Sequence, residues 1–263
     1  MPLLRVHKIA SVFFHYRLDE FLPPLPLWVK AIFLLLPWRY CGRCNADLSR
    51  GERLRLALEQ LGPVFVKFGQ LLSTRPDLVP DDIVKELSRL QDNVPPFSAE
   101  TFVSIVEKAF AQPVGEVFAG FDRQALASAS VAQVHCAKLH NGREVVVKVI
   151  RPDIRQTIEH DVSLMLFLAK LAEKLFIDGR RLRAVDVVKD YRLTILDELD
   201  LQREAANASQ LRRNFIETDK LYVPEVFWDY CKPSVMVMER IYGIPVTDVD
   251  ALREAGINFR VLA

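Results

Sequence analysis

The order of hydrophobic and polar positions divides the chain into a helical first part and a mixed second part. Over residues 51–118 the pattern indicates helices in series. Pro63 follows Gly62 and suits the first position of a helix, and Pro80 precedes two aspartates that favour a helical first turn. Ser98 favours a further helix start.

From about residue 121 the pattern changes to short runs rich in β-branched residues. The runs at 131–135 and 144–150 flank Asn141 and Gly142, a strong signal for a two-residue hairpin. Helical patterns follow at 157–176 and 184–215, and two more β runs lie at 223–226 and 235–238. The predicted order is hairpin, strand, helices, strand and strand.

Composition fits a folded protein, because half of the 263 residues are hydrophobic and a quarter are charged. The net charge of +1 argues against a nucleic-acid partner. Cys41 and Cys44 form one Cys-x-x-Cys without a second ligand pair, so reduced cysteines are favoured over a structural zinc site. No metal site is predicted, and a reducing compartment fits.

The run at 25–36 is apolar apart from Lys30. At about twelve residues it is shorter than the ~20 that cross a bilayer. It suits either a segment in the membrane interface or a helix packed on its own domain. Trp28 and Trp38, with Arg39, slightly favour the interface.

Lys148 lies in the middle of a valine-rich run. A buried lysine needs an anion, although a lysine on an exposed sheet face needs none. Residues 127–130 just upstream are small, so backbone N–H groups there can approach a ligand closely, as in phosphate-binding loops; tight packing is the alternative. Loop, hairpin and strand lysine together have the topology of a kinase small lobe.

An acidic stretch follows on a predicted helix. Asp197, Asp200 and Glu204 are three and four residues apart and are expected to share one face. Such a row needs a cation or metal opposite, unless it is a solvated face beside Arg203 and Arg212. For Glu204 a pair with the strand lysine is the better prediction.

The helix predicted to begin at Pro63 has two stripes. The apolar stripe is Phe65, Phe68 and Leu72, and the polar stripe is Lys67, Gln70 and Thr74. Periodicity alone indicates no more than an amphipathic surface helix.

Five stretches match motifs of one known family. They are 61–80, 127–134, 198–200, 202–207 and 238–245. In that order they resemble the Lys-x-Gly-Gln helix, the alanine-rich loop, the Glu-x-Asp motif, the segment after it and the hinge of the UbiB family of atypical protein-kinase-like proteins. Similarity to the bacterial ubiquinone-biosynthesis branch is close and includes 180–183 and 211–215.

The resemblance implies an α+β fold in which a helical N-terminal extension packs on a protein-kinase-like small lobe. This lobe would have a five-stranded antiparallel sheet and an αC-type helix. The expected divisions are a leader at 1–50, a helical extension at 51–120 and the small lobe at 121–245. Residues 246–263 would be the start of a large lobe that is otherwise missing.

The resemblance also implies an ATP site. Lys148 would hold phosphates and pair with Glu204, and the hinge residue Glu239 would lie beside adenine. The loop over the phosphates would consist of Leu126, Ala127, Ser128, Ala129, Ser130, Val131, Ala132, Gln133 and Val134. No catalytic residue is identified in this chain, and the ligands of Mg²⁺ are expected beyond residue 263.

Lys67, Gly69 and Gln70 form the family's regulatory motif, and by resemblance Lys67 and Gln70 would contact Glu198 and Asp200. This arrangement would exclude protein substrates and favour ATP hydrolysis.

The implied function is an ATP-binding accessory factor, with ATPase activity, for ubiquinone biosynthesis at the cytoplasmic face of the bacterial inner membrane. Its expected partners are ATP with Mg²⁺, lipid quinone precursors or ubiquinone-biosynthesis enzymes, and the membrane surface. The chain is expected to be a piece of a longer protein or a truncated product. A genuine protein kinase, and a nucleotide-independent lipid- or protein-binding scaffold, remain alternatives.

Overall fold

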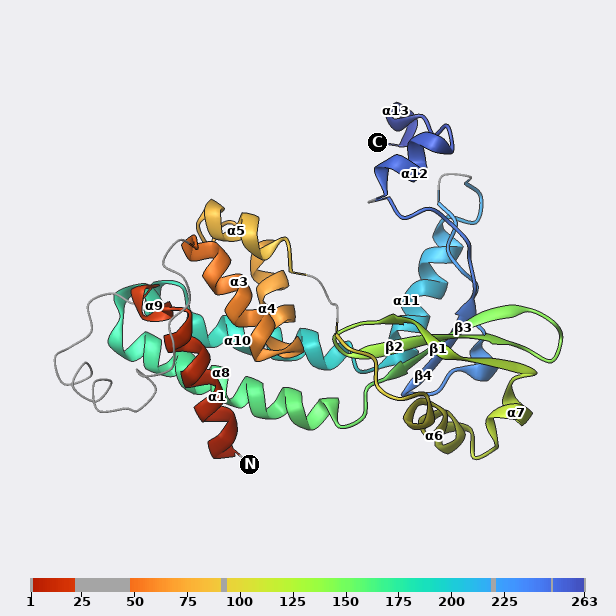
Figure 1. The fold of residues 1–263 in the computed structure, drawn as a ribbon, viewed down its shortest axis with the longest axis horizontal. Helices are drawn as coiled ribbons and strands as arrows, with labels where there is room; N and C mark the ends of the chain where they lie inside the picture. Colours follow the sequence, from red (N-terminus) through yellow and green to blue (C-terminus); the bar gives the residue numbers. More distant parts are fainter. Residues whose placement is uncertain (1, 22–47, 91–93, 219–220, 247, 263) are drawn as a thin grey trace.

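The computed structural model describes residues 2–21, 48–90, 94–218, 221–246 and 248–262. Figure 1 shows a group of helices on one side and an antiparallel sheet with its own helices on the other. The run at 25–36, Cys41 and Cys44 lie outside the described residues. No helix in the described ranges has the length and apolar character needed to cross a membrane.

The helical side contains segments from both halves of the chain. They are α1 (Pro2–His15), η1 (Leu18–Phe21), α3 (Arg50–Leu61), α4 (Pro63–Ser73), α5 (Asp81–Leu87), α8 (Ile154–Leu175), α9 (Ile177–Arg181) and α10 (Ala184–Asp197). Their shared core joins residues far apart in sequence. For example, the Tyr191 hydroxyl of α10 donates to the Val64 carbonyl of α4 at 2.5 Å.

Three helix starts are those that the sequence predicts. Pro63 is the first residue of α4, and Pro80 precedes α5. Ser98 caps α6 by accepting a hydrogen bond from the Thr101 amide. Gly62 is the only residue between α3 and α4, and its φ of 108° is a conformation that other residues rarely adopt.

The sheet side consists of four strands with α6, α7 and α11. The bounds are α6 (Ala99–Phe110), α7 (Val114–Val117), β1 (Gly120–Ser128), β2 (Ala132–Lys138), β3 (Glu144–Ile150), α11 (Leu201–Asn214), η3 (Trp228–Tyr230) and β4 (Val235–Glu239). Two short helices, α12 (Val249–Glu254) and α13 (Phe259–Leu262), follow. The strand order is β1-β2-β3-β4, antiparallel throughout, and the predicted hairpin turn at Asn141 and Gly142 joins β2 to β3.

Alternation along β3 gives the sheet two different faces. Val145, Val147 and Val149 are buried against α6 and α7. Lys148 points to the other face, opposite Val134 of β2 and Met236 of β4. Met236 packs there with α11. The strand register therefore sets Lys148 on the α11 side.

The pattern predicted a strand at 223–226 and the resemblance implied five strands, and neither holds for the described residues. The segment forms a single bridge between Val226 and Met238, supported by hydrogen bonds on either side of it. Pro224 lies within the run and has no N–H to donate to a ladder. The sheet therefore has four strands.

Two other boundaries differ from those predicted. The helix predicted at 184–215 is two helices, because α10 ends at Asp197 and α11 begins at Leu201. The predicted loop at 126–134 is mostly strand, since β1 extends to Ser128 and β2 begins at Ala132. Only 129–131 connect them.

Candidate functional site

Lys148 and Glu204 form a close ion pair between the sheet and α11. The Lys148 ammonium donates to both carboxylate oxygens of Glu204, at 2.6 and 2.8 Å. The side chains are 22% and 41% exposed, respectively, so the pair is open to one side. The predicted pair is thus present, and such charge-assisted hydrogen bonds hold both groups in place.

The pair faces a polar pocket of about 580 Å³. Its lining residues come from α4, the 129–131 connection, β2, β3, α10 and α11: Lys67, Ala129, Ser130, Val131, Ala132, Lys148, Thr194, Asp197, Glu198, Arg203, Glu204 and Asn207. Sequence reasoning did not identify Thr194 or Asn207 as site residues, although Asn207 ends the 202–207 stretch that resembles a family motif.

The connection between β1 and β2 forms one wall of this pocket. The Ala129 amide donates to the Ala132 carbonyl at 2.8 Å, which closes a tight turn. Among the described residues, the amide groups of Ser130 and Val131 have no protein acceptor. Small side chains and open N–H groups at this point suit an anionic ligand.

Arg151 at the end of β3 holds the same connection from behind. Its guanidinium donates to the Ala129 carbonyl at 2.9 Å, the Ser128 hydroxyl at 2.5 Å and the Pro95 carbonyl at 3.1 Å. It also lies over the Phe97 ring. Burial lowers the pKa of Arg151. Sequence reasoning missed this residue, although an arginine directly after an apolar strand was a visible signal.

Lys67 approaches the pocket from the helical side. Its ammonium lies 3.1 Å from Glu198, in the segment between α10 and α11. Gln70, the other polar residue of the same motif, instead donates to the Leu90 carbonyl at 3.1 Å. Within the described part of the chain, the expected contact of Gln70 with the Glu-x-Asp motif is not formed, because its amide binds the segment after α5 instead.

The predicted row of three carboxylates on one helix is also wrong. Asp200 caps α11, and its carboxylate accepts from the amides of Gln202 and Arg203. Asp197 instead pairs with the Arg203 side chain at 2.6 Å. The helix break separates the carboxylates into different roles. Within the described residues, no cluster of three or more His, Cys, Asp or Glu side chains is placed to hold a metal.

Several predicted site residues lie away from the pocket. Leu126 and Ala127 are exposed on β1. Gln133 is buried on the α6 side of the sheet, where its amide group makes two hydrogen bonds with the Phe97 backbone, at 2.8 and 3.0 Å. Glu239 lies at the end of β4 with its carboxylate engaged.

The Glu239 carboxylate accepts from the Tyr222 hydroxyl at 2.6 Å and from the Glu225 amide at 3.1 Å. The hydrogen bond from Tyr222 lowers the pKa of Glu239, against a smaller opposing effect of burial. The role of Glu239 beside adenine, like the other ATP contacts, stays a prediction.

Comparisons with known proteins assign the chain to a family. The family described as the ABC1 atypical kinase-like domain matches residues 89–263. A "Probable protein kinase UbiB" of Pseudomonas aeruginosa is 55% identical over 266 residues, which covers 100% of this chain and 50% of that protein. Another of the same description, from Marinobacter nauticus, is 58% identical over 263 residues and covers 99% and 48%. This chain thus spans about half the length of these relatives.

A solved complex of Rv3197 with erythromycin, from Mycobacterium tuberculosis, covers 73% of this chain and 47% of its own at 26% identity, with a TM-score of 0.49. The family match confirms the expected α+β, kinase-like fold class, with four strands where five were expected.

Proposed function

The chain belongs to the ABC1 atypical kinase-like family, and on this premise we propose that its polar pocket binds the phosphates of ATP. The single observation that carries the proposal is the pair between Lys148 and Glu204 under the 129–131 connection. The pair places a cation in the pocket wall without leaving it an isolated buried charge.

The pocket fits a nucleotide phosphate group in three respects. Lys148 supplies a positive charge that its carboxylate partner orients. Ser130 and Val131 supply backbone N–H groups without a protein acceptor among the described residues. Asn207 adds a polar side chain on α11. When bound, Mg²⁺ with ATP would supply a neutralised, transferable phosphoryl group.

Lys67 and Glu198 support the finer proposal, which is hydrolysis of ATP in place of protein phosphorylation. Their ion pair lines the side of the pocket toward the helical part. A peptide hydroxyl entering from that side would have to displace the pair. We therefore propose that the whole protein is an ATP-hydrolysing accessory factor in ubiquinone biosynthesis at the inner membrane. The UbiB name of the relatives suggests only the part in ubiquinone biosynthesis, and the same description calls them probable protein kinases.

The decisive experiment measures ATP binding by the whole protein and two variants. Lys148→Ala and Glu204→Gln are expected to weaken binding at least about tenfold, which corresponds to ~1.4 kcal/mol. Lys138→Ala is the matched control, because Lys138 is an exposed lysine of the same sheet. Unchanged affinity in both site variants, with all proteins folded by circular dichroism, would overturn the proposal.

A second measurement separates hydrolysis from kinase activity. Labelled ATP is expected to give inorganic phosphate without labelled protein. Labelled protein that disappears in the Lys148→Ala variant would favour a genuine protein kinase instead.

A further inference from the structure

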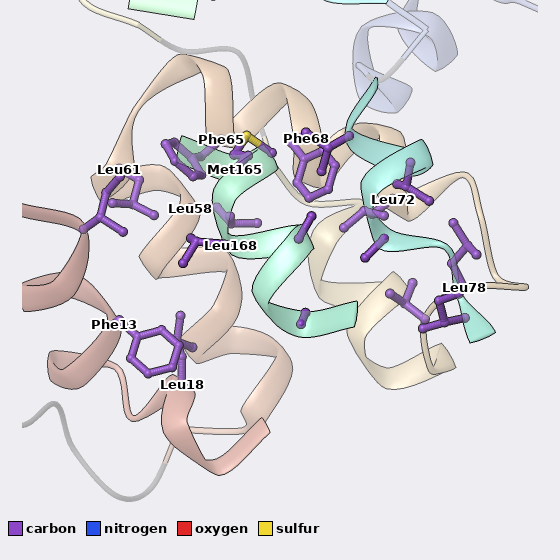
Figure 2. Close-up of a pocket in the computed structure, with 18 residues that line it drawn as sticks. Phe13, Leu18, Leu58, Leu61, Phe65, Phe68, Leu72, Leu78, Met165 and Leu168 are labelled. Atoms are coloured by element: carbon purple, nitrogen blue, oxygen red, sulfur yellow. The ribbon is translucent and has the colours of Figure 1, made fainter. Parts of the chain in front are cut away.

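An apolar cavity of about 440 Å³ lies among the helices of the helical side, away from the polar pocket. Figure 2 shows the 18 side chains that line it, from α1, η1, α3, α4, the segment between α4 and α5, α8 and the α9–α10 region. All of them are apolar, and Phe13, Phe65 and Phe68 are among the largest. The cavity is therefore a different chemical environment from the pocket beside Lys148.

The lining limits what can enter this cavity. A polar group inside would lose its hydrogen bonds to water without replacement, which is costly. The volume is roughly three times the ~150 Å³ of an apolar cavity that stays dry and takes up benzene. A flexible hydrocarbon chain fits this size and chemistry better than water or a single small ring.

The edge of the cavity provides a place for a polar end. Leu168 lines the cavity and is 44% exposed, so an apolar surface leads from the solvent to the interior. Leu182 also lines it, between the exposed residues Arg181 and Arg183. Asp186 pairs with Arg183 at 2.7 Å, yet 180–183 still contains three arginines in four residues. This concentration of positive charge favours an anionic head group.

We propose that this cavity binds the single hydrocarbon chain of an anionic lipid, with its carboxylate or phosphate head beside the arginines of 180–183. The proposal does not depend on nucleotide binding. The apolar stripe of α4, with Phe65 and Phe68, faces this cavity, whereas Lys67 on the same helix faces the polar pocket. The apolar stripe read from the sequence therefore lines this cavity, and Lys67 of the polar stripe lines the other site.

The test uses cis-parinaric acid, a fatty acid whose fluorescence rises in an apolar environment, with the delipidated whole protein. Saturable binding is expected, and Leu168→Glu should weaken it at least about tenfold, because the carboxylate lies at the cavity mouth. Phe167→Glu is the matched control, since Phe167 is the neighbouring residue, is 62% exposed and does not line the cavity. The control is expected to stay within about twofold of the unaltered protein. Equal effects of the two substitutions would overturn the proposal.

Two further measurements use the unaltered protein, so they do not depend on how a variant folds. The alcohol with the same chain should bind at least about threefold more weakly than the acid, because it lacks the charge. A photoreactive fatty acid should label peptides that contain 165–172 and 182–188. Binding of the alcohol as tight as that of the acid, or labelling confined to other peptides, contradicts the proposed site. A cross-link from the cavity to another part of the same chain also contradicts it.

Discussion

Arg5 donates hydrogen bonds to both carboxylate oxygens of Asp161, at 2.7 and 2.5 Å, and so joins α1 to α8. The same guanidinium donates to the Leu61 carbonyl at 2.9 Å and lies over the Phe65 ring. One side chain thus connects the first helix, the α3–α4 junction and a helix from the second half of the chain. The Asp161 side chain is only 1% exposed, so its carboxylate has the Arg5 guanidinium as hydrogen-bond partner in place of water.

Removing one partner of this pair should destabilise the helical part. Arg5→Ala leaves a buried carboxylate without its cation, and such losses cost about 3–5 kcal/mol. A clear fall in melting temperature is expected, followed by circular dichroism. Arg183→Ala is the matched control, because it removes an exposed pair with Asp186 and should leave the melting temperature nearly unchanged. Similar falls in both variants would show that the pair with Asp161 has no special role.

Gly69 is expected to be needed for packing. A Cβ added there would lie 2.5 Å from Leu90 and 2.7 Å from Leu58, both of which are buried. Gly69→Val should therefore cost about 1–3 kcal/mol through overpacking. Gly115 in α7 has open space around it, so Gly115→Val serves as the control. Urea denaturation measures the difference, and a Gly69 variant as stable as the control would contradict the packing argument.

The fold class was predictable from the resemblance to a family, and the central ion pair from a local signal at Lys148 together with that resemblance. A hairpin turn at Asn141 and Gly142 and a lysine in the next strand fix one side of the site. The partner Glu204 follows from the fold that these residues resemble, and the structure brings the two together at 2.6 Å.

The errors arise where one residue outweighs a regular pattern. Pro224 prevents a fifth strand, although 223–226 is otherwise rich in strand-forming residues. Asp200 caps α11 after α10 has ended at Asp197, although periodicity continues through this break. The roles of Gln70 and Arg151 depend on backbone carbonyls of distant segments, and a sequence pattern does not encode such contacts.

Acid should weaken the anchoring of β4 through Glu239. Its pKa is lowered from the ordinary 4.5, chiefly by the Tyr222 hydrogen bond. A lowered folded-state pKa adds stability above pH 4.5, and this stability is lost as the pH falls through the folded-state value. Tyr222→Phe should therefore be less stable near neutral pH by about 0.2–1 kcal/mol, because the pair is partly exposed.

The difference between Tyr222→Phe and the unaltered protein should shrink as the pH falls below 4.5. Urea denaturation at several pH values measures it. In a Glu239→Gln background the same substitution should show no such pH dependence, since no carboxylate remains. If Tyr222→Phe lowers the free energy of unfolding by the same amount at every pH in the protein that keeps Glu239, the proposed linkage is ruled out.

Arg151 is expected to act as a positioning residue for the 129–131 connection. Its guanidinium reaches the Ala129 carbonyl, the Ser128 hydroxyl and the Pro95 carbonyl at once, whereas a lysine ammonium lacks the planar fork that makes this possible. Arg151→Lys keeps the charge but should loosen the connection. Amide exchange at 129–131 should become faster, and ATP affinity should fall about three- to tenfold, or ~0.7–1.4 kcal/mol.

The matched control is Arg155→Lys, an exposed arginine at the start of α8. A purely structural role for Arg151 would lower the melting temperature without changing local exchange, so exchange measured well below melting separates the two explanations. If exchange at 129–131 is the same in both variants, Arg151 does not hold the connection. If exchange increases while ATP affinity stays constant, Arg151 holds a connection that the nucleotide does not use, and the phosphate contact must lie elsewhere in the pocket.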